Sequence, residues 1–102
     1  MAKYVYLYTG GQSNDTPQAQ EAAMAAWGGW LEGLGAALTD FGNPFGASAT
    51  VNADGSSDGA SSGGSGYSIV EADSLQDAIA KTKGCPVFDG GGTVEVFEAI
   101  AM

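Results

Sequence analysis

The first apolar segment of the chain alternates tyrosines with aliphatic residues. Tyr4, Tyr6 and Tyr8 occupy one face of the predicted strand, and Val5 and Leu7 occupy the other. A strand with two apolar or aromatic faces needs cover on both sides. Since the chain has only two helical patterns, we expect helices on one face of the sheet and a second copy of the same sheet on the other.

A helical pattern of apolar residues follows this strand. Its start is marked by Thr16 and Pro17, a hydroxyl N-cap followed by proline at the first helical position. The apolar stripe consists of Ala23, Trp27, Trp30, Leu31, Leu34 and Leu38. It predicts a helix that faces a core and ends before the turn at Asp40–Gly46.

Four glycines interrupt this helical pattern, namely Gly28, Gly29, Gly33 and Gly35. Each costs a helix about 1 kcal/mol relative to alanine. We expect the tertiary contacts of the two tryptophans to outweigh this cost. The alternative is that the glycines admit a ligand or the backbone of a partner.

The second half of the chain repeats the order of strand and helix. The predicted strands of the whole chain span Lys3–Thr9, Ala47–Asn52, Tyr67–Ala72 and Thr93–Ile100. Ser74 caps the second predicted helix, whose inner face is Leu75, Ala78, Ile79 and Thr82, with Gly84 and Pro86 at its end.

This order of elements predicts an α+β fold of the ferredoxin-like βαββαβ type. A four-stranded antiparallel sheet would carry both helices on one face. Residues 1–102 are expected to form a single domain. Within it, the Gly/Ser-rich run over residues 54–66 has almost no apolar side chain, so it is predicted to be a flexible loop.

Several stretches also resemble a known family. They are Ala2–Tyr8 (AKYVYLY), Ala26–Ala37 (AWGGWLEGLGAA), Gly66–Ala72 (GYSIVEA), Gly84–Pro86 (GCP) and Gly91–Val96 (GGTVEV). In order and spacing they resemble the YCII-related family and its DGPF-containing branch, although the Gly/Ser run replaces the DGPF motif. The resemblance implies a homodimer, a dimeric α+β barrel in which two sheets face each other.

The same resemblance bears on catalysis. The enzymatic branch of the family is proposed to use a histidine on the first helix with a nearby aspartate, and the position of that histidine falls at about Trp27. A tryptophan does not transfer protons at neutral pH, so the dyad is absent. We therefore lean toward a protein that is not an enzyme.

Composition excludes several partners. The 12 acidic residues outnumber the 3 lysines, and the net charge is −9. Nucleic acids and anionic membranes are therefore not expected as partners, because both bind through Lys and Arg. The chain start has no apolar signal region and no stretch approaches about 20 apolar residues. We expect a cytoplasmic protein.

The reactive side chains are few. Without histidine there is no Ser-His or Cys-His pair. Cys85 is the single cysteine, which we expect to be a buried structural thiol, the alternative being a lone nucleophile or redox thiol. Glu71 and Glu95 would be an acid–base pair if they shared a face of neighbouring strands, but solvated charges are the favoured interpretation.

One segment partly matches a calcium-binding loop. Asp54, Ser56, Asp58 and Gly59 stand at its first, third, fifth and sixth positions, but Ser65 replaces the glutamate at the twelfth. The Gly-rich runs do not match a dinucleotide fingerprint. No metal or cofactor is therefore expected.

Aromatic side chains are the remaining candidates for a site. The predicted ligand-binding residues are Tyr4, Tyr6, Tyr8, Trp27, Phe45 and Tyr67. We expect the helices to cover Val5 and Leu7, so that the tyrosines face an inter-sheet cavity.

The leading hypothesis is a small dimeric protein that binds an apolar or aromatic small molecule in this cavity. The alternatives are a metal-free enzyme of the same architecture, monooxygenase-like or lyase-like, and a purely structural oligomerisation partner whose aromatic residues form core and interface.

Overall fold

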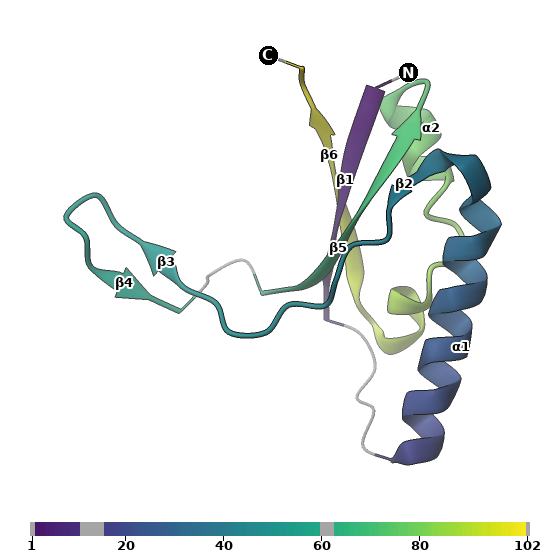
Figure 1. Cartoon of the computed structure of the whole chain (residues 1–102), viewed down its shortest axis with the longest axis horizontal. Coiled ribbons are helices and arrows are strands. Elements are labelled where there is room, and N and C mark those ends of the chain that lie inside the picture. The colour runs from purple at the N-terminus through teal and green to yellow at the C-terminus, as the bar shows by residue number, and fades with distance from the viewer. Residues whose placement is uncertain (1, 11–15, 60–62, 102) are drawn as a thin grey trace.

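The computed structural model describes residues 2–10, 16–59 and 63–101. It is an α+β fold with a four-stranded antiparallel sheet in the order β2-β5-β1-β6 and two α-helices (Figure 1). The strands of this sheet are β1 Ala2–Thr9, β2 Leu38–Asp40, β5 Gly64–Ala72 and β6 Thr93–Ala99. The arrangement is compatible with the predicted ferredoxin-like fold.

Both helices begin at the caps that the sequence predicts. In α1, Pro17–Leu34, the Thr16 hydroxyl oxygen accepts a hydrogen bond from the backbone N–H of Ala19 at 3.0 Å. In α2, Leu75–Ala80, the Ser74 hydroxyl oxygen accepts from the N–H of Asp77 at 3.1 Å. These bonds satisfy N–H groups that have no partner inside the helix.

The tyrosines of β1 lie beneath the helices. Tyr4, Tyr6 and Tyr8 are 3%, 0% and 5% exposed, and they form the core together with Trp27, Trp30 and Leu34 of α1 and Ala78 of α2. The prediction that these tyrosines face an inter-sheet space is therefore wrong. Alternation separates the tyrosines from Val5 and Leu7 but does not say which set faces the helices.

The physical reason for this orientation lies in the partners that the helices offer. The Tyr6 hydroxyl donates a hydrogen bond to the backbone carbonyl of Ala78, and the two tryptophans of α1 supply rings for aromatic contacts. A buried phenol needs such a polar partner, whereas Val5 and Leu7 need none.

The opposite face of the sheet is open and largely apolar. β1 is central, so Val5 lies between Ile69 of β5 and Phe97 of β6. In the next row on this face, Leu7 lies between Tyr67 and Glu95. Phe97 is 50% exposed here. No described helix covers this face (Figure 1).

The chain after α1 differs from its prediction. α1 ends at Leu34, because Gly35 has a positive φ of 57° and begins a short 3-10 helix, Gly35–Ala37. Leu38, predicted as the last residue of the helical stripe, instead begins the edge strand β2. In β2 the apolar side chain of Leu38 still packs against the core. Its helical spacing in the sequence therefore fits both a helix and a strand at this position.

The second half also departs from prediction at several points. α2 is a short helix and only Ala78 of its predicted inner face is buried, while Leu75 and Ile79 are about half exposed. Gly84, with φ +84°, comes after a turn and precedes a 3-10 helix, η2 Pro86–Gly90. β6 ends one residue before its predicted end at Ile100.

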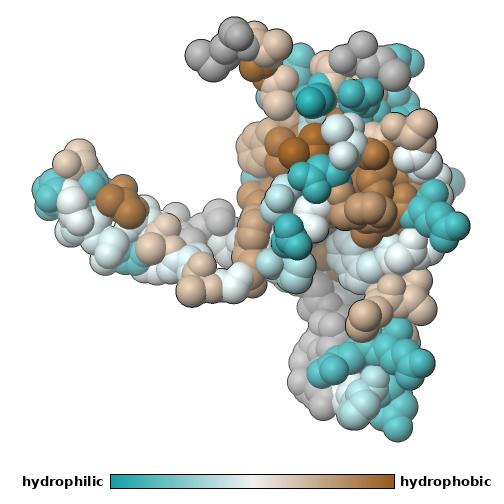
Figure 2. Space-filling model, viewed as in Figure 1, coloured by the Kyte–Doolittle hydropathy of each residue, from teal (hydrophilic) through white to brown (hydrophobic). Residues whose placement is uncertain are grey.

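The predicted strand Ala47–Asn52 does not join the main sheet. Instead, β3 Thr50–Val51 and β4 Ser57–Asp58 pair with each other. This two-stranded hairpin, the arm, extends away from the body and carries mainly hydrophilic residues (Figures 1 and 2). Its one large exposed apolar residue is Val51.

The predicted flexible loop over residues 54–66 is thus divided. Its first part is the arm's turn and β4, residues 60–62 lie outside the described residues, and its last part belongs to β5. Ser65 there accepts a backbone bond from Phe45 N–H at 2.9 Å, and its hydroxyl donates to the Tyr8 carbonyl at 3.1 Å.

We predict that the arm is dispensable for folding but that residues 64–66 are not. Phe45 already pairs with Ser65, so Asn-Gly in place of residues 47–63 would close a two-residue turn between Gly46 and Gly64. The entropic cost of closing a loop changes by only about 0.6 kcal/mol when the loop length is halved. The thermal midpoint should shift by no more than a few degrees, measured by circular dichroism.

The matched control is the same turn with residues 64–66 also removed, which should lower the midpoint far more. Equal loss in both variants would mean that the arm is an integral part of the fold.

Candidate functional site

An aromatic layer joins α1 to the sheet. The ring of Trp27 meets Tyr8 edge to face at 4.8 Å between centroids, and Trp30 at 5.8 Å. Trp30 in turn stacks near Tyr6 at 6.3 Å and its indole N–H donates to the Lys83 carbonyl at 3.2 Å. Offset and edge-to-face pairs at these distances are favourable beyond the area they bury.

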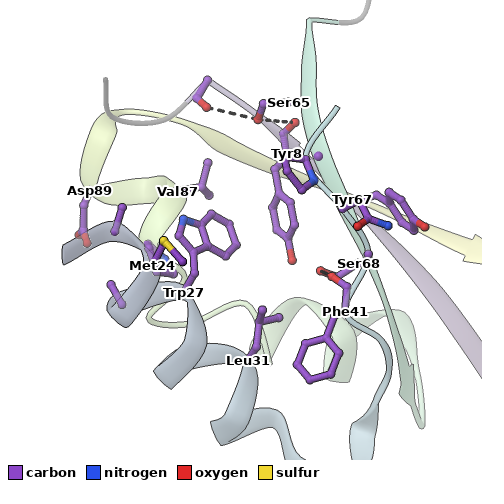
Figure 3. A pocket seen from close by; sticks show the side chains of 18 of the residues that line it. Tyr8, Met24, Trp27, Leu31, Phe41, Ser65, Tyr67, Ser68, Val87 and Asp89 are labelled. Carbon is purple, nitrogen blue, oxygen red and sulfur yellow. Dashed lines mark hydrogen bonds between the residues drawn. The ribbon is translucent and has the colours of Figure 1, made fainter. Parts of the chain in front are cut away.

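A pocket of about 710 Å³ lies where this layer ends, between α1, η2 and the loop that follows β2. Figure 3 shows Trp27, Leu31 and Met24 of α1 on one side, with Tyr8, Phe41 and Ser68 facing them. The volume is within the range of small-molecule sites. The site is thus a concave, mostly apolar wall built within one chain.

The loop with Phe41 is fixed by close backbone contact. Gly42 has a φ of +73°, and a Cβ on it would overlap the backbone carbonyl oxygen of Tyr67. Its N–H donates to the Asp40 carboxylate at 2.9 Å. The Ser68 hydroxyl donates to the Phe41 carbonyl at 2.7 Å. Only glycine permits this approach, which holds Phe41 at the pocket.

The Tyr8 hydroxyl is one of the polar groups that border the pocket. It is buried and forms no hydrogen bond of normal geometry with a described residue, although the Ser68 hydroxyl lies close to it. Its end points toward Ser68, Leu31 and Phe41 (Figure 3). Burial raises the pKa of Tyr8 well above its usual range, and the neighbouring Ser68 hydroxyl offsets part of that rise. The phenol is therefore protonated at neutral pH.

The predicted site residues separate into three groups. Tyr8, Trp27 and Tyr67 border the pocket, although the Tyr67 ring points away from it (Figure 3). That ring stacks at 5.8 Å on Phe45, which is not among the residues that border the pocket. Tyr4 and Tyr6 are core residues that do not border it.

Sequence reasoning missed several of the lining residues. Met24 and Leu31 lie three residues before and four after Trp27, so helical spacing was a signal that could have placed them beside it. Phe41, Val87 and Asp89 come from segments without a regular pattern. The position of these three residues at the pocket follows only from the tertiary fold.

Other candidate chemistry is not assembled. Glu71 and Glu95 share the open face, but β1 lies between their strands, so the expectation that they stand on neighbouring strands is wrong. Among residues 2–10, 16–59 and 63–101, no group of three or more His, Cys, Asp or Glu side chains is placed to hold a metal ion.

The partial calcium loop folds as the tip of the arm. The Asp54 carboxylate accepts hydrogen bonds from the Ser56 N–H at 2.8 Å and from its hydroxyl at 2.6 Å. The carboxylate of Asp58 accepts from the Asn52 amide at 3.4 Å. These side chains therefore support the turn of the hairpin.

Cys85 is buried, as the sequence predicts for a structural thiol. Burial raises the pKa of its thiol to about 11, and the Asp89 carboxylate adds to this effect. At neutral pH the group is a protonated thiol, which is a poor nucleophile.

Comparison with family models, with curated proteins and with solved structures finds no match to this chain. The predicted likeness to the YCII-related family therefore stays a prediction. In the described part of the chain, no helix has the length and apolar character needed to cross a membrane.

We predict that alkaline pH destabilises the fold partly through Cys85. An unfolded thiol has a pKa near 8.5, so the unfolded chain loses this proton first. The thiol's contribution to the free energy of unfolding is therefore complete below that pH. It is lost as the pH rises toward 11, by up to about 1.4 kcal/mol per pH unit. Urea unfolding at pH 7.5 and 10 measures it.

Cys85→Ala should be less stable at pH 7.5, because it leaves a small cavity, yet lose less stability between the two pH values. Tyr6, whose pKa burial raises to about 12, acts mainly above pH 10 and is common to both proteins. The same loss in both proteins would show that the thiol does not contribute.

Proposed function

We propose that this chain is a binding protein that takes an apolar or aromatic small molecule in the pocket beneath α1. The observation that carries the proposal is the pocket itself, a mostly apolar space of about 710 Å³ next to the buried hydroxyl of Tyr8, which has no hydrogen-bond partner in the described part of the chain. A mostly apolar wall with a small number of polar groups is typical of small-molecule sites.

The side chains at the pocket favour binding over catalysis. Trp27, Leu31 and Phe41 offer contact area, and Asp89 is the only carboxylate among the described lining residues. Tyr8 stays protonated at neutral pH. The ligand site proposed here thus lies within one chain, on the helix side of the sheet, and not between two sheets.

We predict that filling the pocket weakens binding of a neutral fluorescent probe, N-phenyl-1-naphthylamine. Ala23 of α1 borders the pocket, so Ala23→Phe should place a ring in it and weaken binding at least fivefold. The dye's emission rises in an apolar site, and its titration gives the Kd. Circular dichroism checks that the variant is folded.

Ala22→Phe is the control, because Ala22 is exposed on the same helix and does not border the pocket. Its affinity should equal that of the wild type. Absence of binding to the wild type, or equal affinity in all three proteins, would contradict the proposed function.

We also propose that two copies pair through the open face of the sheet, as in the dimeric α+β barrels of the YCII-related family. The support is the row Ile69, Val5 and Phe97, with Leu7 beside it, which leaves apolar side chains without cover in the single chain. Both helices lie on the other face, so a second sheet has access to this one.

We predict that Phe97→Glu yields a folded monomer. The side chain is half exposed in the single chain, so the fold tolerates the charge, whereas at a dimer interface an unpaired carboxylate is desolvated. The dimer Kd should rise on the order of a hundredfold. Sedimentation equilibrium at micromolar concentration measures it.

Leu75→Glu is the matched control, since Leu75 is 46% exposed on α2, on the helix side. It should leave the dimer intact. A wild-type monomer, or an unaffected Phe97→Glu dimer, would rule out pairing through this face.

A further inference from the structure

We propose that the pocket selects aromatic amines in their protonated form, with the ammonium group toward Asp89 and a polar atom of the ring at the Tyr8 hydroxyl. This inference rests on the proposed function, because it names the class of ligand for the same pocket.

The charge at the pocket is negative without a neighbouring cation. Asp89 is the only charged side chain among the described lining residues. The chain has no arginine or histidine, and its three lysines do not border the pocket. Lys3 pairs in register with Glu71 on the open face, and Lys81 forms an ion pair with Asp77 at 3.2 Å.

This distribution disfavours an anionic ligand. A carboxylate in the pocket would find no positive side chain and would also meet the net charge of −9. An ammonium ion has the opposite balance, because the field of the whole protein and the Asp89 carboxylate both attract it.

The rings of the site suit the same class. Trp27 and Phe41 border the pocket, and Tyr8 packs edge to face on Trp27. Aromatic rings bind flat aromatic ligands and also attract cations placed over their faces, tryptophan most strongly. An aromatic ring that carries an amine therefore uses both properties.

Two of the polar groups that line the pocket, the Asp89 carboxylate and the Tyr8 hydroxyl, lie at separate ends of it. In Figure 3, Asp89 is at one side of Trp27 and the Tyr8 hydroxyl is at the other. Asp89 is exposed, so it meets an ammonium group that stays partly hydrated. The Tyr8 hydroxyl is buried without a partner among the residues described, and a hydroxyl or ring heteroatom of the ligand would satisfy it.

The test compares three probes with the same ring and different charge. They are tyramine (cation), tyrosol (neutral) and 4-hydroxyphenylacetate (anion), titrated into the full chain at neutral pH and low salt. The indole N–H signal of Trp27 reports binding by NMR. We expect tyramine to bind about tenfold more tightly than tyrosol, and 4-hydroxyphenylacetate most weakly, with the difference shrinking at higher salt.

Variants then assign the two ends. Asp89→Asn should weaken the binding of tyramine about two- to fivefold, as expected for an exposed ion pair, and leave the binding of tyrosol unchanged. Asp73→Asn is the control, because it makes the same change in net charge away from the pocket. Asp73 follows the end of β5 that does not border the pocket. It should have no comparable effect.

The Tyr8 contact is tested with phenethylamine, which lacks the ring hydroxyl. Tyramine should bind more tightly than phenethylamine to the wild type, and Tyr8→Phe should remove that preference. The result from Asp89→Asn, an exposed position, decides the charge selectivity even if Tyr8→Phe does not fold.

The outcomes separate this inference from the proposed function. Equal or tighter binding of tyrosol, or binding of the neutral dye without binding of tyramine, overturns the selectivity and leaves the apolar pocket in place. Absence of dye binding as well overturns both.

Discussion

The contact between the tyrosine face of β1 and the tryptophans of α1 determines how the rest of the molecule is arranged. Tyr6 is fully buried, donates a hydrogen bond to the Ala78 carbonyl of α2 and lies near the ring of Trp30. Because side chains alternate across a strand, this choice places Val5 and Leu7 on the opposite face. The orientation of β1 therefore determines which face of the sheet packs against the helices and which face stays open.

The same contact also explains where the pocket lies. α2 has only six residues and covers the sheet near Tyr6, where Ala78 fills the space. Tyr8, two residues further along β1, packs against Trp27 instead, and the space beyond it is bounded by the Phe41 loop and η2. The Tyr8 hydroxyl, which has no hydrogen-bond partner among the described residues, lies where the packed core ends and the pocket begins.

Local patterns predicted the parts of the fold that local chemistry controls. Thr16 and Ser74 cap their helices through hydrogen bonds to residues three positions away, so sequence spacing alone is sufficient. The end of α1 depends on a positive φ at Gly35, and the edge strand at Leu38 depends on pairing with distant β5. Of the site, Tyr8 and Trp27 were identified, whereas Asp89 reaches the pocket only through the tertiary fold.

The orientation of the tyrosine face is tested most directly by nuclear Overhauser effects between aromatic rings in solution. The chain has four tyrosines and two tryptophans, so these ring signals are few enough to assign. The account predicts cross-peaks from Tyr6 to Trp30 and to the Ala78 methyl, and from Tyr8 to Trp27. Cross-peaks from the Val5 and Leu7 methyls to the tryptophans, with none from Tyr6 and Tyr8, would contradict it.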